Sequence, residues 1–201
     1  MAMNIAIKRE ISAVEYLKGE LVSDVKHEQI DGEAYPMAGV SKNHQRIAVN
    51  ISRLVGNFLI NSPCGPFSSD IKIKVGKNFF YPDAMVVCDD QTDNEYYTKS
   101  PTILVEVLSK STRRTDETIK RMAYQSIPTL QEFILIEQDF VDIEACRRSE
   151  GWLSRHYFLG DQFTLESISL SLSVEEIYHR VNNDNVMNYL QEQQANSNSQ
   201  P

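Results

Sequence analysis

Three short runs of mostly apolar sequence limit what this chain can fold into. They cover residues 84–88, 102–108 and 132–137, and polar or turn-forming residues bound each of them. A strand with one wet face alternates apolar and polar side chains, whereas a strand buried on both faces stays apolar almost throughout. We therefore expect these runs to form the centre of a β-sheet that is flanked by helices.

Capping residues, turn residues and the period of the apolar side chains predict the surrounding elements. Ser12 and Ser173 are each followed three positions later by glutamate, which predicts helices over 12–17 and 173–181. The pair Asp31-Gly32 predicts a hairpin turn, because both residue types tolerate positive φ. We expect further helices over 41–60 and 115–126, strands over 67–75 and 79–88, and hairpins over 25–37 and 141–158. This order predicts an α/β fold with a mixed central sheet and additional hairpins.

The length of 201 residues, without an interior linker or repeat, predicts one domain. We place it at residues 1–190 and expect the polar residues 191–201 to form a disordered tail. Apolar residues make up 41% of the chain, which excludes wholesale disorder. The net charge of −8 argues against a protein that coats nucleic acid through bulk positive charge, although it leaves room for a local basic surface.

Three cysteines, Cys64, Cys88 and Cys146, are odd in number and widely separated, with no CxxC pair. This pattern predicts neither a zinc site nor a disulfide framework, and we expect three reduced thiols in a cytoplasmic protein. The first residues lack the apolar core and cleavage site of a signal peptide. No run approaches the ~20 apolar residues that a membrane span requires, so we expect no membrane association.

Glu106 interrupts the apolar run at 102–108, and a carboxylate in a buried strand is costly unless it is paired, protonated or bound to a cation. Asp83 is a second carboxylate at the start of another buried run. If the two strands are neighbours, these side chains can share one cation, and their hard oxygen ligands suit Mg²⁺ or Mn²⁺. The alternative is a structural ion pair between Glu106 and Lys120 or Arg121.

The helix expected over 115–126 carries Asp116, Lys120 and Tyr124 at a spacing of four residues, which places them on one face. Only a short loop separates this helix from the strand with Glu106, so Lys120 can reach the end of that strand. A lysine there can orient or deprotonate a water molecule and neutralise charge on a phosphate. Taken singly, Lys120 is also compatible with a solvated helix cation and Tyr124 with a core aromatic.

Several motifs along the chain occur in the same order as in a known family. They are Tyr81-Pro82-Asp83, Glu106-Val107-Leu108-Ser109 and the pattern of Asp116, Lys120 and Tyr124. Supporting stretches lie at 26–28, 31–33, 43–44, 69–70 and 127–132. Through these motifs the chain resembles, over about residues 12–181, the bacterial family described as "putative restriction endonuclease" within the PD-(D/E)XK nuclease superfamily. The resemblance implies a restriction-endonuclease-like fold and a metal-dependent phosphodiesterase.

The resemblance also implies roles for individual residues. Asp83 and Glu106 would hold Mg²⁺ or Mn²⁺, and the backbone carbonyl of Val107 would be a further ligand. The superfamily pattern has a lysine two positions after the acidic strand residue, where this chain has Leu108. Lys120 on the neighbouring helix is the candidate replacement, and Lys110 in the loop is the alternative. Nucleases of this kind often act as symmetric pairs, so a homodimer is expected.

Five further residues are candidate accessory groups of the site. Glu28 and Asp70 can approach the metal as extra ligands, and His44, near the start of the helix at 41–60, can face a phosphate. Each of these three also has a simpler interpretation as a solvated residue at a hairpin, strand edge or helix start. Asp116 and Tyr124, on the helix that carries Lys120, complete the set.

Positive charge gathers in two segments that flank the predicted site. Residues 41–80 carry six lysines and arginines against one aspartate, and residues 109–121 carry five against two acids. Such segments can hold a phosphate backbone without reading bases, or they are ordinary solvated faces. The candidate DNA contacts are Lys42, Arg46, Lys72, Lys74, Arg113 and Arg114.

The sequence thus predicts a metal-dependent DNA endonuclease in which Asp83 and Glu106 hold the cation and Lys120 positions the attacking water. The missing lysine at position 108 supports an alternative, a catalytically inactive nucleic-acid-binding or assembly module on the same fold. An ion pair between Lys120 and Glu106 would favour the inactive module.

Overall fold

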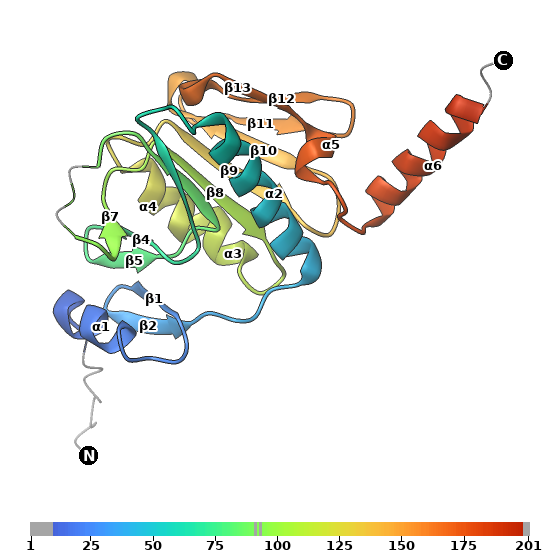
Figure 1. Ribbon diagram of the computed structural model, residues 1–201. Coiled ribbons are helices and arrows are strands. Elements are labelled where there is room, and N and C mark those ends of the chain that lie inside the picture. The colour runs from blue at the N-terminus through green and yellow to red at the C-terminus, as the bar shows by residue number, and fades with distance from the viewer. Residues whose placement is uncertain (1–9, 91, 93, 199–201) are drawn as a thin grey trace.

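The computed structural model describes residues 10–198 apart from Gln91 and Asp93, and its mixed α/β architecture is the one that the sequence predicts (Figure 1). The central sheet has six strands in the order β11-β10-β9-β8-β6-β3. In that order they span Ser154–Tyr157, Ile143–Arg147, Glu132–Glu137, Ile103–Leu108, Ala84–Val87 and Gly65–Ser68. β8 and β9 are parallel and all other neighbours are antiparallel, so the mixed central sheet is confirmed.

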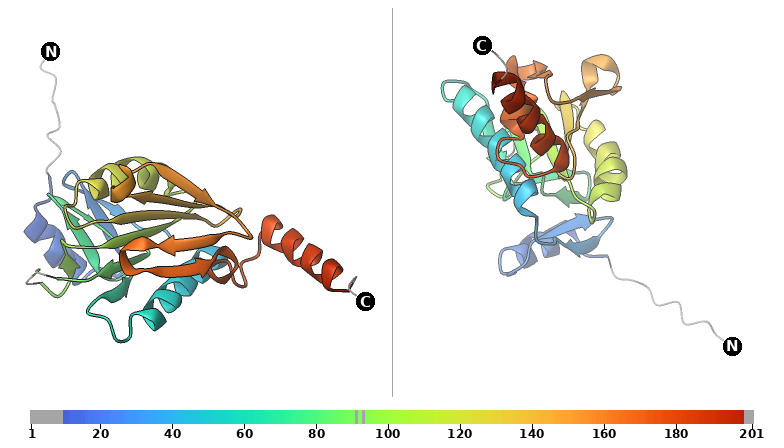
Figure 2. Two further views of the ribbon diagram at one scale, coloured as in Figure 1. Left: turned by 90° about the horizontal axis from the view of Figure 1, so that it is seen from above. Right: turned by 90° about the vertical axis from the view of Figure 1, so that its right-hand side faces the viewer.

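Helices cover both faces of this sheet (Figure 2). α2 (Lys42–Phe58) lies on one face, and on the other lies a continuous helical segment formed by α3 (Arg113–Thr115), the π-helical turn η1 (Asp116–Lys120) and α4 (Arg121–Gln125). Val105 of β8 packs in the core with Ile51 of α2, whereas Leu104 packs with Tyr124 of α4. Because side chains alternate along a strand, Glu106 shares the α4 side with Leu104.

A second sheet has the strand order β2-β1-β5-β4-β7. Its strands span, in that order, Glu33–Pro36, His27–Ile30, Asn78–Phe80, Lys72–Val75 and Tyr97–Thr98. The predicted hairpin over 25–37 is confirmed, with Asp31 and Gly32 both at positive φ in its turn. The N-terminal helix is also confirmed as α1 (Ala13–Glu20), and the Ser12–Glu15 capping box begins it.

The predictions of single strands over 67–75 and 79–88 were wrong, because each stretch is divided between the two sheets. β3 and β4 are separated by a turn at Ser68, whose carbonyl accepts from the backbone of Asp70. β5 and β6 are separated by Tyr81-Pro82-Asp83. Proline has no backbone N–H and cannot continue a strand ladder. This second break leaves Asp83 at the junction of the two sheets, immediately before β6.

The C-terminal part contains more structure than the sequence predicts. A hairpin of β12 (Gln162–Leu165) and β13 (Leu170–Ser173) was not predicted. The helix expected over 173–181 is short, α5 (Val174–Ile177), although its Ser173–Glu176 capping box is confirmed. α6 (Asp184–Asn198) extends from the body of the molecule, so the expected disordered tail at 191–201 is helical to Asn198, and residues 199–201 lie outside the described part (Figure 1).

The expectation of three reduced thiols was wrong, since Cys64 and Cys88 form a disulfide. Gly65 pairs with Val87 in the β3–β6 ladder, so the next residues outward face each other although they are far apart in sequence. Cys146 is free and buried. The cytoplasmic location rested on reduced thiols and stays a prediction. Within residues 10–198, Gln91 and Asp93 aside, no helix has the length and apolar character that crossing a membrane requires.

Candidate active site

Asp83 and Glu106 lie opposite each other at the edge between β6 and β8. Ala84 pairs with Val105 in this antiparallel ladder, and continuing the register by one residue sets Asp83 against Glu106. The expectation that their strands are neighbours is therefore confirmed. Asp83 Oδ2 accepts a hydrogen bond of 2.7 Å from the backbone N–H of Val107. In a strand the N–H and C=O of one residue point to the same side, so the Val107 carbonyl also faces Asp83.

Lys120 is buried at the centre of three carboxylates. Its Nζ lies 2.8 Å from Glu28 Oε1, 3.2 Å from Glu106 Oε1 and 3.1 Å from Asp116 Oδ1. These four side chains, the Lys120 cluster, are each no more than 9% exposed. The contact with Glu106 is a hydrogen bond, whereas the contact with Asp116 Oδ1 is an ion pair without hydrogen-bond geometry. Of the two ion-pair partners proposed for Glu106, Lys120 is the one observed, while Arg121 contacts Glu144.

The helix turn that carries Asp116 and Lys120 is π-helical. The N–H of Arg121 donates to the carbonyl of Asp116, five residues earlier, where an α-helix would have a spacing of four. The prediction of a regular helix over 115–126 was therefore wrong within this turn. Such single wide turns are frequent at functional sites. Asp116, Lys120 and Tyr124 nevertheless lie on one side of the helix, next to Glu106, as their spacing predicts.

Two tyrosines complete the surroundings of the cluster. The Tyr124 hydroxyl donates to Glu106 Oε1 at 2.8 Å. The backbone N–H of Tyr81 donates to Glu28 Oε1 at 3.1 Å, so Glu28 contacts both Lys120 and the motif that carries Asp83. Glu28 comes from β1 of the second sheet. The cluster thus joins the two sheets at the break before β6.

Burial and mutual repulsion change the acid–base properties of the cluster. Burial raises the pKa of Glu106 well above its ordinary value, and the nearby Asp116, Asp83 and Glu28 carboxylates raise it further against the opposing effect of Lys120. Burial also raises the pKa of Asp116. For Lys120 burial lowers the pKa, but the three carboxylates outweigh it, and the pKa lies well above its ordinary value. The three carboxylates therefore favour the protonated form of Lys120.

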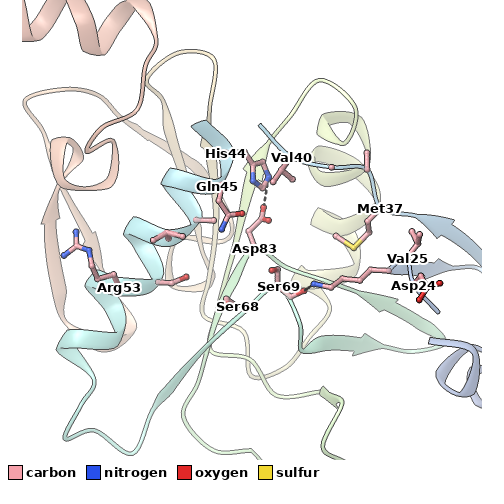
Figure 3. A pocket seen from close by; sticks show the side chains of 16 residues that line it. Asp24, Val25, Met37, Val40, His44, Gln45, Arg53, Ser68, Ser69 and Asp83 are labelled. Carbon is pink, nitrogen blue, oxygen red and sulfur yellow. Dashed lines mark hydrogen bonds and ion pairs between the residues drawn. The ribbon is translucent and has the colours of Figure 1, made fainter. Parts of the chain in front are cut away.

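His44, near the start of α2, contacts Asp83 from the other side (Figure 3). Its Nε2 lies 3.3 Å from Asp83 Oδ2, and only 5% of the residue is exposed. The N-cap Ser41 accepts from the backbone N–H of His44 and so fixes the helix turn that holds the imidazole. Nδ1 of His44 is buried and has no hydrogen-bond partner. The interpretation of His44 as a surface histidine was therefore wrong.

The Lys120 cluster, His44 and Asp83 line a cavity of 360 Å³. Hydroxyl groups of Ser109, Ser111 and Thr112, in the loop after β8, lie at its wall. Ser109 belongs to the motif that begins at Glu106, whereas Ser111 and Thr112 were not predicted as site residues, although hydroxyl residues directly after a strand with a buried acid were a visible signal. In the described part of the chain, no three acid, histidine or cysteine side chains are arranged as a ready metal cage.

The donor set nevertheless fits a hexacoordinate cation that keeps several waters. Mg²⁺ is bound in proteins through one or two carboxylates, with water completing its shell. Asp83 and Glu106 supply two carboxylates, and the carbonyl of Val107 is directed to the same side. Asp116 Oδ1 is buried without a hydrogen-bond partner, as expected where the negative groups outnumber the donors.

Several predicted site residues lie away from this cavity or are engaged elsewhere. Asp70 forms an ion pair with Lys26 and is largely exposed. Lys72 is buried over the ring of Tyr81, and Lys74 lies over the rings of Phe79 and Tyr97, so both candidate DNA contacts already have aromatic partners. Arg113 is bound to Glu137 and Glu117. The residues that remain exposed are Lys42, Arg46, Lys110 and Arg114.

Comparison with known proteins places these features in a family. The family described as "Putative restriction endonuclease" (Uma2) matches residues 13–175. Two uncharacterized proteins of Synechocystis sp. are similar to the chain. The first, slr1290, is 37% identical over 175 residues, which cover 84% of this chain and 92% of that protein. The second, sll1609, is 37% identical over 141 residues, which cover 68% and 80%.

A solved structure shares the fold. It is described as a "putative nuclease belonging to DUF820" from Anabaena variabilis, and it matches with a TM-score of 0.71 over 84% of this chain and 97% of its own. The identity is 17%, so this likeness concerns the fold. The predicted fold class is thereby confirmed as that of a nuclease-like α/β protein.

Proposed function

The chain belongs to the Uma2 family, and on that basis we propose that it is a metal-dependent endonuclease that hydrolyses phosphodiester bonds in DNA. We propose that Asp83 and Glu106, with the carbonyl of Val107, hold Mg²⁺ or Mn²⁺. A cation held there supplies positive charge for the scissile phosphate and activates water for attack.

The observation that carries this proposal is the excess of negative charge in a buried place. Glu28, Glu106 and Asp116 surround one lysine, and Asp83 adds a fourth carboxylate at the same cavity. Buried carboxylates that outnumber their counter-charges are costly, and proteins resolve this by protonation or by binding a cation. The raised pKa of Glu106 is the expected sign of that imbalance in the metal-free protein.

The protein's own residues have distinct tasks in this scheme. Lys120 keeps its proton and lies against Glu106, so it orients the attacking water or a phosphate oxygen as a fixed positive charge. Tyr124 holds the same oxygen of Glu106 and fixes the carboxylate. His44 holds Asp83 from the α2 side. Lys42, Arg46 and Arg114 are exposed and can contact the DNA backbone, and we propose that the protein forms a homodimer.

A second candidate is the inactive nucleic-acid-binding or assembly module. The Lys120–Glu106 ion pair is the contact that favours it, and Leu108 stands in place of the usual lysine. An ion pair that serves structure alone should be balanced, however, and this lysine faces three carboxylates. The charge imbalance therefore favours the enzyme.

Incubation with plasmid and single-stranded DNA in Mg²⁺, Mn²⁺ or Ca²⁺ tests the proposal. We expect cleavage by the parent protein in Mg²⁺ or Mn²⁺ and loss of cleavage in Asp83→Asn and Lys120→Ala. Glu144→Gln is the matched control, since Glu144 is also a partly buried carboxylate with a cationic partner but lies away from the cavity. Binding of DNA by a parent protein that cleaves no substrate in any of these metals would establish the inactive module instead.

A further inference from the structure

A second cavity, of 710 Å³, adjoins the first and has no task in the proposed mechanism. Both cavities are lined by Asp83, His44 and the connector at 37–40 between β2 and α2. The second one opens between α2 and the turn at Ser68 and Ser69, as Figure 3 shows from close by. A substrate held at Asp83 must therefore extend past or into this space.

The lining of the second cavity is close to neutral in charge. Its cations are Lys26 and Arg53, and its acids are Asp24 and Asp83. Lys26 is already bound to Asp70 and to the carbonyl of Ser69, and Arg53 extends away from the cavity centre (Figure 3). Surfaces that hold the phosphates of duplex DNA are rich in unpaired lysine and arginine. This cavity instead suits an uncharged part of a substrate.

A neutral hydrogen-bonding side chain on the cavity wall is free to contact a ligand. The amide of Gln45 lies beside His44 and Asp83 (Figure 3) and makes no hydrogen bond within the described part of the chain. Apolar side chains of Val25, Met37 and Val40 also line the cavity. Apolar walls with a few neutral donors and acceptors are what a nucleobase requires.

We propose that this cavity binds the base and sugar of an unpaired nucleotide whose phosphate lies at Asp83. The proposal rests on the nuclease function and specifies its substrate class as single-stranded or locally unpaired nucleic acid. Gln45 contacts the edge of the base, because its amide offers both a donor and an acceptor. A base in a duplex is stacked and paired and cannot enter a pocket without leaving the helix, at a cost of about a few kcal/mol.

Binding of fluorescein-labelled DNA, measured by anisotropy in Ca²⁺, tests the cavity separately from cleavage. We expect a short single strand to bind at least about tenfold more tightly than the same sequence in a duplex. Val49 is half-exposed on the cavity wall, and Val49→Trp should fill the space and weaken single-strand binding about tenfold. Asn57→Trp, at an exposed position of α2 outside the cavity, should leave binding unchanged. Gln45→Ala should reduce the differences in affinity among homopolymers of the four bases.

The outcomes separate this proposal from the proposed function. Duplex binding as tight as single-strand binding would overturn the cavity proposal, and so would equal affinities of Val49→Trp and Asn57→Trp for the single strand. Cleavage that depends on Asp83 would then still support the nuclease. Conversely, single-strand binding that Val49→Trp weakens, in a protein that cleaves nothing, would support the cavity and contradict the nuclease.

Discussion

Two buried clusters of opposite charges, both within the part of the chain that the structure describes, differ in balance. One is the Lys120 cluster, and the other surrounds Arg147 of β10, which is 1% exposed. Arg147 Nε lies 3.2 Å from Glu132 Oε2, and Glu132 is itself 2% exposed. The other acids near Arg147, Glu150 and Glu166, lie nearer the surface. One buried cation therefore meets one buried acid, whereas in the Lys120 cluster one buried cation meets three.

Each cluster contains one buried carboxylate oxygen without a hydrogen bond, Glu150 Oε2 beside Arg147 and Asp116 Oδ1 beside Lys120, so unsatisfied hydrogen bonds do not distinguish them. Glu132 accepts from Arg147 and from the backbones of Glu166 and Ser167, so both of its oxygens are used. Arg147 donates further to the Tyr157 hydroxyl and the Thr164 carbonyl. Neither Arg147 nor Glu132 lines a described cavity, whereas the Lys120 cluster does. Burial of charge alone therefore does not point to a site, and our proposal for the Lys120 cluster rests on its excess of buried acid at a cavity.

Removing a proposed ligand should have the largest effect. We expect Asp83→Asn to lower the rate of DNA cleavage at least about a thousandfold, equivalent to about 4 kcal/mol, because the cation loses one of two carboxylates. The free energy of unfolding should stay within about 1 kcal/mol of the parent value. Single-turnover kinetics measure the cleavage rate, and urea unfolding measures the free energy of unfolding. An Asp83→Asn protein that fails to fold would show that Asp83, like Arg147, serves stability.

The balanced cluster should show the reverse pattern. Arg147→Ala leaves Glu132 buried without its cation, so we expect the free energy of unfolding to fall by about 3–5 kcal/mol. Cleavage per folded molecule should be unchanged. Urea unfolding and a rate normalised to the folded fraction check this. If fully folded Arg147→Ala protein cleaved DNA more slowly than the parent, the two clusters would not be functionally distinct.

Replacing the central lysine should separate catalysis from metal binding. We expect Lys120→Gln to lower the cleavage rate about a hundredfold, as when a preorganised electrostatic group is lost. Its affinity for Mn²⁺ should be equal or higher, since the carboxylates lose a competing cation. Isothermal titration calorimetry measures the Mn²⁺ affinity, and single-turnover kinetics measure the cleavage rate of the same variant. Lower Mn²⁺ affinity would mean that Lys120 supports the carboxylates instead of competing for them.

A smaller effect is expected at Glu28, which positions Lys120 without holding the cation. Glu28→Gln keeps an oxygen that accepts from Tyr81 but loses the charge that faces Lys120. We expect kcat to fall about tenfold while KM and Mn²⁺ affinity stay near the parent values. Loss of Mn²⁺ binding would instead make Glu28 a ligand, which was one of the sequence-based hypotheses.

The smallest predicted effect is a pH dependence of stabilisation by metal. The raised pKa of Glu106 means that the metal-free folded protein holds a proton that the unfolded chain releases, so its stability falls as pH rises above the ordinary glutamate pKa. A divalent cation replaces that proton and removes the loss. We expect Mn²⁺ to raise the melting temperature by about 2–4 °C more at about pH 8 than at about pH 5. An equal shift at both values would contradict this.

The sequence predicts local elements well and long-range contacts less well. The strand at 102–108 and the hairpin turn at Asp31-Gly32 follow from patterns within short stretches. The proximity of Asp83 to Glu106 was conditional on their strands being neighbours, which the β6–β8 pairing supplies. The break at Pro82, which divides one predicted strand between two sheets, depends on tertiary pairing. The same holds for Glu28, which reaches Lys120 from a different sheet. The Cys64–Cys88 disulfide likewise depends on the pairing of β3 with β6. The π-helical turn has no signal in the local sequence pattern.

The proposal that the excess of acid at the cavity takes up a divalent cation can be tested by calorimetric titration of the metal-free protein with Mn²⁺. We expect saturable binding by the parent and by the control Glu144→Gln. We expect that binding to be lost when Asp83→Asn and Glu106→Gln are combined. Equal binding by the parent and the combined variant, or no binding by the parent, would contradict the proposal.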